Sequence, residues 1–504
     1  MTLPLCENLP FRWTSQRASI GLFSLFLVEN SSDRATQPSR PCSTSLCLSG
    51  GKNPVNLYNK NKISRIPLFL VQIQAERDCE SGPTHRVWCC TRVLEAAAQK
   101  ISSFLDIHSS GQQIEMSCKG IVARGTERFS VAPMQGVTDA SFRRLARLLS
   151  QHATIYSEMV VDKTILNNPK KALSHLQVPR PSSRDVLQLG GHDPNTLHSA
   201  ALAAKSLGYT SLNLNCGCPS DTVAGKGAFG ASLMLEPERV ADCISAMHES
   251  SGLPVSVKHR TGVDDVTCNT DTYEQLLAFV DTVHERSSFG CDLFIVHARK
   301  AMLNRSMSPR ANRTVPELKH NWVHSLARDR PHLRFVLNGG LASASDLPLD
   351  LISQEDGKSG ITGIMLGRQM QNDLWSTLAG IDGSALFNDP ESLPTSRRAV
   401  LEQYARECDA VKGSIVWQES DGHLVPSVLT QLQPLFAMFT GVHRARKWKQ
   451  AVDDDIKARG RSTSITLSSV LENTLHILPD EALDSPPQIP EISATAEHRQ
   501  MALA

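Results

Sequence analysis

Eight short runs rich in β-branched and other apolar residues alternate with helical segments between residues 129 and 366. Each run is almost continuously apolar, which is typical of strands buried on both faces of a sheet. Strict strand–helix alternation, repeated eight times, predicts an α/β fold of the closed (β/α)8 TIM barrel type. An open doubly wound sheet is the alternative. The predicted strands are residues 129–132, 154–158, 186–189, 211–215, 255–258, 293–297, 335–337 and 364–366.

Helical periodicity fills the intervals between these strands, at residues 140–149, 195–207, 236–250, 272–286 and 344–352. Asp139, Asp193 and Ser343 stand where N-cap side chains are expected. Beyond about residue 382 the strand pattern stops, and residues 395–411 and 426–457 are predicted to be helical. The barrel is therefore expected to be followed by a small helical domain.

The two ends of the chain lack such periodicity. Residues 1–125 carry scattered Ser, Pro and Asn, and only Glu7, Glu29 and Asp33 are acidic among the first sixty residues. This composition predicts a disordered or transit-like extension, which leaves the compartment open between cytoplasm and organelle. The expected domains are residues 1–125 (extension), 126–385 (barrel), 390–460 (helical domain) and 461–504 (flexible tail).

Composition limits the classes of partner. The 504 residues include 52 Lys and Arg and 51 Asp and Glu, a formal net charge of +1, so any nucleic-acid contact must be a local patch. The dense apolar stretch at residues 21–28 is much shorter than the roughly 20 residues of a membrane helix, so no membrane partner is expected. Thirteen cysteines without zinc-type spacing predict a reducing compartment and no metal site.

The residues that end the strands carry the chemistry, because catalytic groups in such barrels lie at the carboxyl ends of the strands. Glycine-containing turns after the seventh and eighth strands, 338–340 and 367–368, predict a phosphate site. Gln188, Lys258 and His297 could then face a planar cofactor. Residues 225–230 fit G-x-G-x-x-G but do not open a helix after a strand, so they predict a mobile lid and no Rossmann site.

Seven motifs in order complete the pattern: Ser130–Met134, Val186–Gly191, Leu212–Ser220, Val257–Arg260, Val296–Ala301, Leu337–Gly340 and Met365–Arg368. Together they resemble the tRNA-dihydrouridine synthases, most closely the bacterial A-type subfamily. The resemblance covers residues 128–383 and extends more loosely to 458. It implies an oxidoreductase that uses FMN, with NADPH (or NADH) as electron donor, to reduce the C5–C6 double bond of a uridine in the tRNA D-loop, at position 20 or 20a.

The resemblance also implies a role for each matching residue. Cys218 would donate the proton, whereas Cys216 stands at a position that is usually aliphatic. Substrate tRNA would be bound by Asn215, Arg310 and Arg313, and by the cations between His443 and Lys449 around Trp448. The family's usual Arg-His pair, one of its tRNA contacts, is replaced by Gln433-Pro434. The cofactor-binding residues would be Pro133, Met134, Gln135, Gln188, Lys258, His297, Asn338, Gly339, Gly340, Gly367 and Arg368.

Two other functions compete with this interpretation. Another FMN barrel acting on a free pyrimidine would not require Arg310 or Arg313. A catalytically silent RNA-binding relative would not require Cys218, Lys258 or the two phosphate turns. We expect tRNA as the partner and a monomer as the oligomeric state.

Overall fold

The computed structural model describes residues 46–50, 55–57, 64–66, 69–73, 127–167, 184–225, 227–265, 269–303, 307–308, 310–346, 360–412, 426–459 and 465–492. The chain divides into two compact units, residues 1–118 and 119–504. In the first unit, β1 (Leu46–Gly50) pairs antiparallel with β4 (Phe69–Ile73), and β2 (Val55–Leu57) with β3 (Ser64–Ile66). The sequence predicts none of these strands. The remainder of the expected extension lies outside the described residues.

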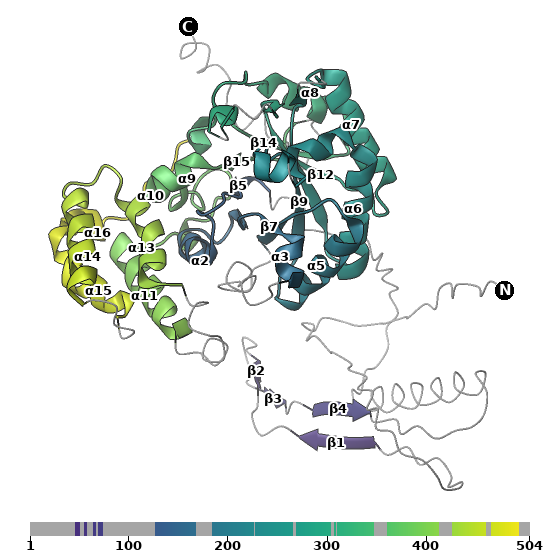
Figure 1. Ribbon diagram of the computed structural model, residues 1–504. Coiled ribbons are helices and arrows are strands. Elements are labelled where there is room, and N and C mark those ends of the chain that lie inside the picture. The colour runs from purple at the N-terminus through teal and green to yellow at the C-terminus, as the bar shows by residue number, and fades with distance from the viewer. Residues whose placement is uncertain are drawn as a thin grey trace. The chain divides into compact units, whose positions relative to one another are not determined.

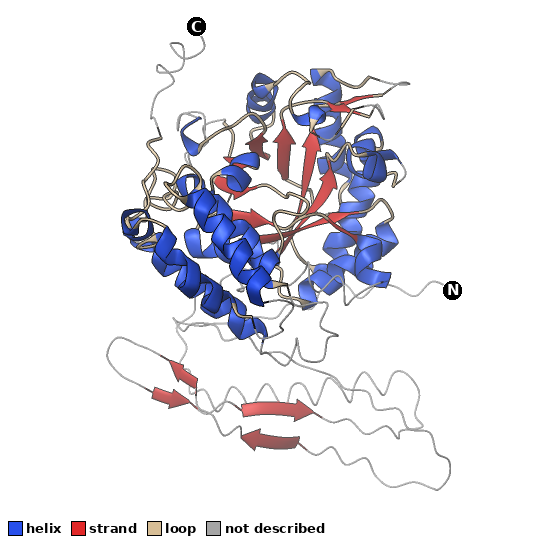
Figure 2. Cartoon of the chain, turned by 60° about the vertical axis from the view of Figure 1, so that its left-hand side comes forward, coloured by secondary structure: helices blue, strands red, loops and turns tan. Residues whose placement is uncertain are grey.

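The second unit contains a closed barrel of eight parallel strands, seen as the central strands of Figures 1 and 2. The ring closes because β15 pairs with β5 and β6 pairs with β8. This closure confirms the TIM barrel and excludes the open sheet. The strands are β5 (Phe129–Val131), β6 (Thr154–Tyr156), β8 (Asp185–Gly190), β9 (Ser211–Cys216), β10 (Val255–Arg260), β12 (Leu293–His297), β14 (Arg334–Asn338) and β15 (Gly363–Leu366).

Three very short strands lie at the carboxyl ends of the main barrel strands. β7 (Val160–Val161) pairs with the last residues of β8. β11 (Val263–Asp264) and β13 (Ala301–Met302) follow β10 and β12 and pair with each other. These pairings fix the loops that form the mouth of the barrel.

Alternation along the strands separates two apolar cores. Ile295, Val336 and Met365 belong to a small cluster of six buried residues, whereas Phe294 and Phe335 belong to the larger core that includes the surrounding helices. Neighbouring residues of one strand therefore face opposite sides of the sheet, as strand geometry requires. All of these side chains are fully buried.

Helices follow the strands as the periodicity predicts. Asp139 and Asp193 are N-caps, since Asp139 Oδ1 accepts from the Phe142 N–H (2.8 Å) and Asp193 Oδ1 from the Asn195 N–H (3.0 Å). Ser343 precedes a 3-10 turn (Ala344–Asp346), after which residues 347–359 lie outside the described residues. The helices are α2 (Ala140–Leu149), α3 (Asp162–Asn167), α5 (Pro194–Ser206), α6 (Pro237–Ser251), α7 (Tyr273–Arg286), α8 (His320–Asp329), α9 (Arg368–Asn372) and α10 (Leu374–Leu378).

Further helices form the part drawn in light green and yellow in Figure 1. Those in the described residues are α11 (Arg397–Lys412), α13 (Val428–Phe436), α14 (Ala445–Arg459), α15 (Leu467–Thr474) and α16 (Asp480–Asp484). The expected helix 426–457 is interrupted between α13 and α14. Gly441 (φ +78°) and Arg444 (φ +63°) have left-handed backbone there, which a continuous helix does not allow. None of the described helices is both long enough and apolar enough to span a bilayer.

Residues 465–492 differ from the expected flexible tail. Leu467, Val470 and Leu471 are at most 2% exposed, and the Asp409 carboxylate of α11 accepts from the Leu467 N–H (2.8 Å) at the start of α15. Gln488 then lies directly against Gly380, which follows α10. The two backbones are so close that a Cβ added at Gly380 would lie 1.9 Å from the Gln488 carbonyl oxygen. Sparse apolar residues at helical spacing are therefore enough to hold this segment in place.

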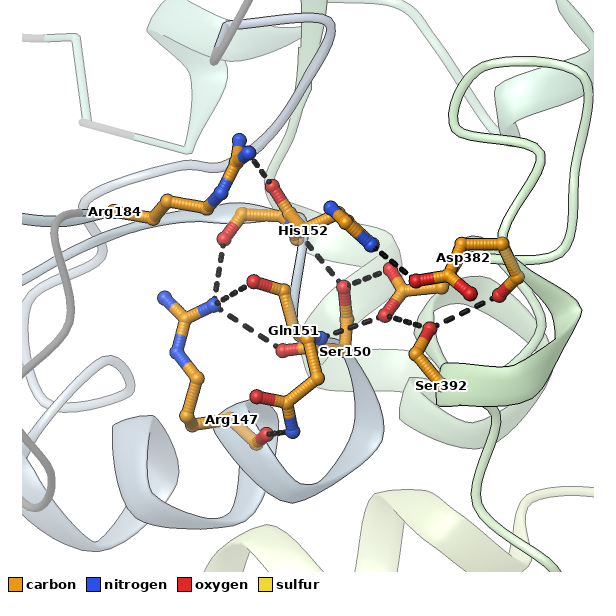
Figure 3. A network of polar contacts seen from close by, with 9 residues as sticks. Arg147, Ser150, Gln151, His152, Arg184, Asp382 and Ser392 are labelled. Atoms are coloured by element: carbon orange, nitrogen blue, oxygen red, sulfur yellow. Dashed lines mark hydrogen bonds and ion pairs between the residues drawn. The ribbon is translucent and has the colours of Figure 1, made fainter. Parts of the chain in front are cut away.

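A buried polar network joins the barrel to the segment that leads into the C-terminal helices (Figure 3). The Asp382 carboxylate accepts from Ser150 Oγ (2.5 Å) and from Ser392 Oγ (3.1 Å). Arg147 of α2 forms a buried ion pair with Asp185 (2.9 Å) and donates to three backbone carbonyls after α2. Asp185 begins β8, so the network lies at the amino-terminal end of the barrel, the end associated with stability.

Candidate active site

Lysine and asparagine side chains meet at the mouth of the barrel. Lys258, on β10, donates from Nζ to Asn338 Oδ1 on β14 (2.9 Å), and Asn338 Nδ2 donates to the Met365 carbonyl oxygen on β15 (2.7 Å). Burial, and next the like charge of Arg260, lower the pKa of Lys258 to about 7. An anionic group at this place would restore the charged form. Two of the expected cofactor ligands are thus in direct contact.

A chain of amides runs across β8, β9 and β10. Asn215 Nδ2 donates to Gln188 Oε1 (2.8 Å), Gln188 Nε2 donates to Asn213 Oδ1 (2.8 Å), and Asn213 Nδ2 donates to Ser256 Oγ (2.9 Å). Asn213 is fully buried, whereas Asn215, at the end of β9, is 9% exposed. The network fixes which end of each amide faces its neighbour, so Gln188 and Asn215 are preorganised.

Asn215 also shapes the turn that carries the two cysteines. Its Oδ1 accepts from the N–H groups of Gly217 (3.1 Å) and Cys218 (3.0 Å). Cys216 is fully buried in the larger core, which includes the surrounding helices, and burial raises the pKa of its thiol well above the usual value. Cys218 is half-buried, and its thiol lies 3.5 Å from Ser220 Oγ. Only one of these two thiols is therefore accessible to a substrate.

The glycine-rich segment after Cys218 packs back against it. Ala231 N–H donates to the Cys218 carbonyl oxygen (2.9 Å), and a Cβ at Gly230 (φ +67°) would lie 2.7 Å from that oxygen. A π-helical turn, Asp221–Gly225, and a 3-10 helix, Gly230–Leu235, flank the segment, so it does not join a strand to an α-helix. These elements differ from the strand, turn and α-helix in which a Rossmann fingerprint lies. Lys226 lies outside the described residues, and the lid stays a prediction.

Glu158 supports the loop after β5 and was missed by the sequence analysis as a site residue. Its Oε2 accepts from Gln135 Nε2 (2.9 Å) and from the Gly136 N–H (3.0 Å), although the side chain is only 2% exposed. Met134 N–H donates to Thr138 Oγ1 (3.0 Å) in the same loop, which begins at Pro133. The signal was available, because Glu158 ends the second predicted strand.

Two glycines form the turn after β14. Gly339 (φ +98°) and Gly340 (φ +76°) adopt left-handed backbone, and a Cβ at Gly339 would lie 2.4 Å from Cδ2 of His297. Burial and the nearby cations Arg260 and Lys258 lower the pKa of His297 far below its usual value, so the imidazole is neutral. Gly367 and the exposed Arg368 stand at the junction of β15 and α9. The turn at Gly339 and Gly340 directly follows Asn338. Glycine turns and the starts of helices are common places for phosphate to bind to backbone N–H groups.

Arginines gather on this side of the barrel. The pKa values of Arg299 and Arg313 are lowered by burial first and then by the like charge of Arg368. Cations held close enough to lower each other's pKa indicate a binding site for anions. The donor set, Lys258 with the glycine turns and these arginines, fits a phosphorylated cofactor and a polyanionic substrate.

Arg260 is a second residue that the sequence analysis did not assign. Its guanidinium is 3% exposed and donates to the carbonyl oxygens of Gly217 (3.2 Å), Lys300 (3.1 Å) and Asn312 (2.8 Å). Burial lowers its pKa to about 10. Arg260 therefore ties the cysteine turn to the loop after β12. The predicted Lys258-His259-Arg260 strand end contained this signal.

Two groups of exposed cations are the expected contacts for tRNA. Arg310 precedes a 3-10 turn (Ala311–Arg313) and Arg313 ends it; the middle residue of the turn, Asn312, accepts from Arg260. The second group opens α14, next to α9, because Thr440 Oγ1 donates to the Asn372 carbonyl oxygen. It comprises Arg444, Arg446, Lys447 and Lys449, all exposed and, in the described part of the chain, without salt bridges.

Trp448 does not take part in this second cationic group, contrary to the expectation of cations around an aromatic ring. It is 1% exposed, packs between Phe436 and Phe439, and donates from Nε1 to Thr474 Oγ1 (3.2 Å). Helical spacing turns the cations outward and the indole inward. Gln433 is exposed and Pro434 is buried within α13. In the described residues, no cluster of His, Cys, Asp and Glu is arranged to hold a metal ion.

Comparison with known proteins gives consistent matches over the second unit. The family model "Dihydrouridine synthase (Dus)" matches residues 130–472. A tRNA-dihydrouridine(20/20a) synthase of Pasteurella multocida is 37% identical over 338 residues, which are 67% of this chain and 94% of that protein. Proteins of the same name from Escherichia coli K12 (34% identity, 70% and 92% covered) and Yersinia pestis (36%, 67% and 89%) match similarly. The matched region contains the barrel mouth and reaches α15.

Proposed function

The chain belongs to the dihydrouridine synthase family, and on this basis we propose that it reduces the C5–C6 double bond of a uridine in the D-loop of tRNA, at position 20 or 20a. The observation that carries the proposal is the half-buried Cys218 thiol at the barrel mouth, in a turn whose Cys218 backbone N–H donates to the preorganised Asn215 amide oxygen (3.0 Å). A flipped-out uridine base fits such a site, because it presents both ring atoms and amide-like edges.

We assign FMN as the cofactor and NADPH (or NADH) as the electron donor. Pro133, Met134 and Gln135 would lie beneath the flavin ring, with Gln188, Lys258 and His297 along its polar edge. The phosphate would bind at the turns that contain Asn338, Gly339, Gly340, Gly367 and Arg368. When bound and reduced, FMN supplies the hydride that reaches C6 of the uridine.

Cys218 completes the reduction as general acid. As C6 accepts the hydride, negative charge develops at C5 and O4 of the uracil ring, and the S–H bond of Cys218 breaks while a C5–H bond forms. Asn215 holds the base edge next to this thiol, since its amide already positions the Cys218 backbone N–H. Arg260 fixes the same turn from the other side through the Gly217 carbonyl oxygen.

Substrate tRNA would be held by Arg310, Arg313 and the four cations of α14. The barrel (residues 126–385) would then select the uridine, and the helical part (390–460) would bind the tRNA backbone. Local cationic groups are needed because the whole chain has a net charge of only +1.

The direct test loads the purified full chain with FMN and incubates it with NADPH and an unmodified tRNA transcript. Mass spectrometry of nuclease fragments should show a gain of two hydrogens at the uridine of position 20 or 20a. An enzyme whose flavin is reduced by NADPH but that leaves tRNA unchanged while reducing free uracil would overturn the proposal.

A further inference from the structure

A cavity lies beside the active-site mouth. It has a volume of about 300 Å³ and is lined by residues from the loops after β10 and β12, among them Asp271, Lys300, Met302, Val315 and Lys319. Val315 lies two residues after Arg313 and is 66% exposed. Two residues of extended chain span at most roughly 7 Å. The cavity is therefore a near neighbour of the arginine assigned to tRNA.

The walls of this cavity are held in place by the barrel. Lys319 N–H donates to the Ala298 carbonyl oxygen (2.8 Å), and Ala301 N–H donates to the Gly262 carbonyl oxygen (2.8 Å). Arg299 donates to the carbonyl oxygen of Pro316, which also lines the cavity. These bonds tie Pro316, Lys319 and the segment that begins at Ala301 to the residues that follow β10 and β12.

The chemistry of the lining differs from that of the active site. Lys300 is paired with Asp264 (2.7 Å), and Lys319 is paired with Asp271 (2.8 Å) and lies 3.8 Å from the ring centre of Trp322. The lining itself contains two ammonium groups, Lys300 and Lys319, and two carboxylates, Asp271 and Glu317. Balanced charge disfavours a phosphate and suits a neutral group that both donates and accepts hydrogen bonds. Met302, Val315 and Pro316 add an apolar surface for a flat ring.

We propose that this cavity binds the base of the nucleotide next to the uridine being reduced, and that it prefers uracil. The inference rests on the proposed function. Extruding one nucleotide from a tRNA loop removes the stacking partner of its neighbour, so the neighbouring base needs a new contact. Uracil offers one donor, N3–H, for a carboxylate and two acceptors, O2 and O4, for ammonium groups. A uridine at position 20a would occupy the cavity while the uridine at position 20 is reduced. A uridine at position 20 would occupy it while the uridine at position 20a is reduced.

The first test changes only the substrate. Three transcripts carry uridine at position 20 and, at 20a, uridine, cytidine or an abasic ribose that keeps the phosphate. The wild-type holoenzyme should show a KM roughly tenfold higher for the abasic and cytidine transcripts, with kcat at position 20 unchanged, since a well-placed pair of base contacts has about this effect. Equal KM values for the uridine and abasic transcripts would overturn the proposal.

A matched pair of variants tests the cavity itself. Val315→Trp fills its opening and should raise the KM for the uridine transcript about tenfold, while abolishing the difference between uridine and abasic transcripts. Leu202→Trp, at an apolar residue of α5 that is 49% exposed, should behave as wild type. FMN affinity and thermal unfolding verify that both variants fold. A Val315→Trp enzyme that still distinguishes the transcripts overturns the cavity assignment alone, whereas no dihydrouridine in any transcript overturns the proposed function as well.

Discussion

Lys258 of β10 reaches past β12 to donate a 2.9 Å hydrogen bond to Asn338 of β14. The contact joins the residue expected at the polar edge of the flavin to the residue expected at its phosphate. It holds an ammonium group in a partly buried site, next to the like charge of Arg260. The protein is therefore arranged to receive an anion there, and this has a measurable consequence in the ligand-free state.

Stability of the ligand-free protein should depend on the titration of Lys258. Its pKa is lowered from 10.5 to about 7 in the folded state, so between these values the unfolded chain binds more protons than the folded chain. Stability then rises with pH across this window, and below it the lysine is fully destabilising. Lys258→Met should raise Tm more at about pH 6 than at about pH 9.5. Equal shifts of Tm at both pH values in thermal unfolding would contradict this.

Removal of Glu158 should weaken FMN binding. In Glu158→Ala the Gln135 amide and the Gly136 N–H lose their acceptor, which costs about 1–3 kcal/mol and releases the loop after β5. Glu158→Gln keeps one oxygen and should be milder. Asp162→Ala removes an equally buried carboxylate whose partners lie on α3 and α5, and it serves as control. The prediction fails if fluorescence titration gives Glu158→Ala and Asp162→Ala the same FMN affinity.

The two cysteines should respond differently to substitution. Cys218→Ala removes the accessible thiol, so dihydrouridine formation should stop while reduction of bound flavin by NADPH continues. Cys216→Ala leaves a small space in the core and should cost roughly 0.5–3 kcal/mol of unfolding free energy with turnover retained. Single-turnover assays and urea unfolding separate the two effects. A Cys216→Ala enzyme without turnover would show that the proton donor is misassigned.

The cations at the start of α14 should set the salt dependence of tRNA binding. Each change of Arg444, Arg446, Lys447 or Lys449 to Gln should lower the magnitude of the log K against log[salt] slope by roughly 0.7–0.9 for every phosphate that the variant no longer neutralises. Lys205→Gln, at an exposed lysine of α5, should leave the slope unchanged. Filter binding over a series of salt concentrations measures both. If the fourfold variant keeps the wild-type slope, tRNA is held by the barrel loops alone.

Helix α15 should contribute to the stability of the whole second unit. Leu471→Ala truncates a side chain that is 2% exposed and should cost about 2–5 kcal/mol in urea unfolding. Leu429→Ala, at a residue of α13 that is 48% exposed, should have little effect. Equal unfolding free energies for the two variants would indicate that residues 465–492 pack only loosely.

The barrel could be predicted because its signal is local. Continuous apolar runs, their regular spacing and the caps Asp139 and Asp193 are each readable within a few residues, and eight repeats leave little freedom for another fold. The same rule, that function lies at strand ends, led to Lys258 and Asn338. Alternation of side chains along a strand could not distinguish Cys216 from Cys218, because the two residues are two positions apart. The turn that Asn215 organises decides which thiol faces the mouth.

Features that depend on contacts between distant segments were not predictable. The partners of Glu158 and Arg260 lie on other loops, so their roles appear only when the strand ends are brought together. The sequence places Trp448 among cations, but Phe436, Phe439 and Thr474, which surround its ring in the structure, come from other segments. The helices after residue 465 have few apolar residues, and these few suffice because α11 and α14 supply the rest of the core.

The close approach of Gln488 to Gly380 has a consequence for synthesis in the cell. Protein chains fold from the amino terminus as they leave the ribosome. Here, a contact at the end of the barrel region must wait for residues that emerge long after the last barrel strand. Nascent chains would leave the surface around Gly380 uncovered until residue 488 has emerged. Early stop codons within α14 to α16 should therefore cause degradation of the truncated chain, even though every residue expected to bind the cofactor has already been translated.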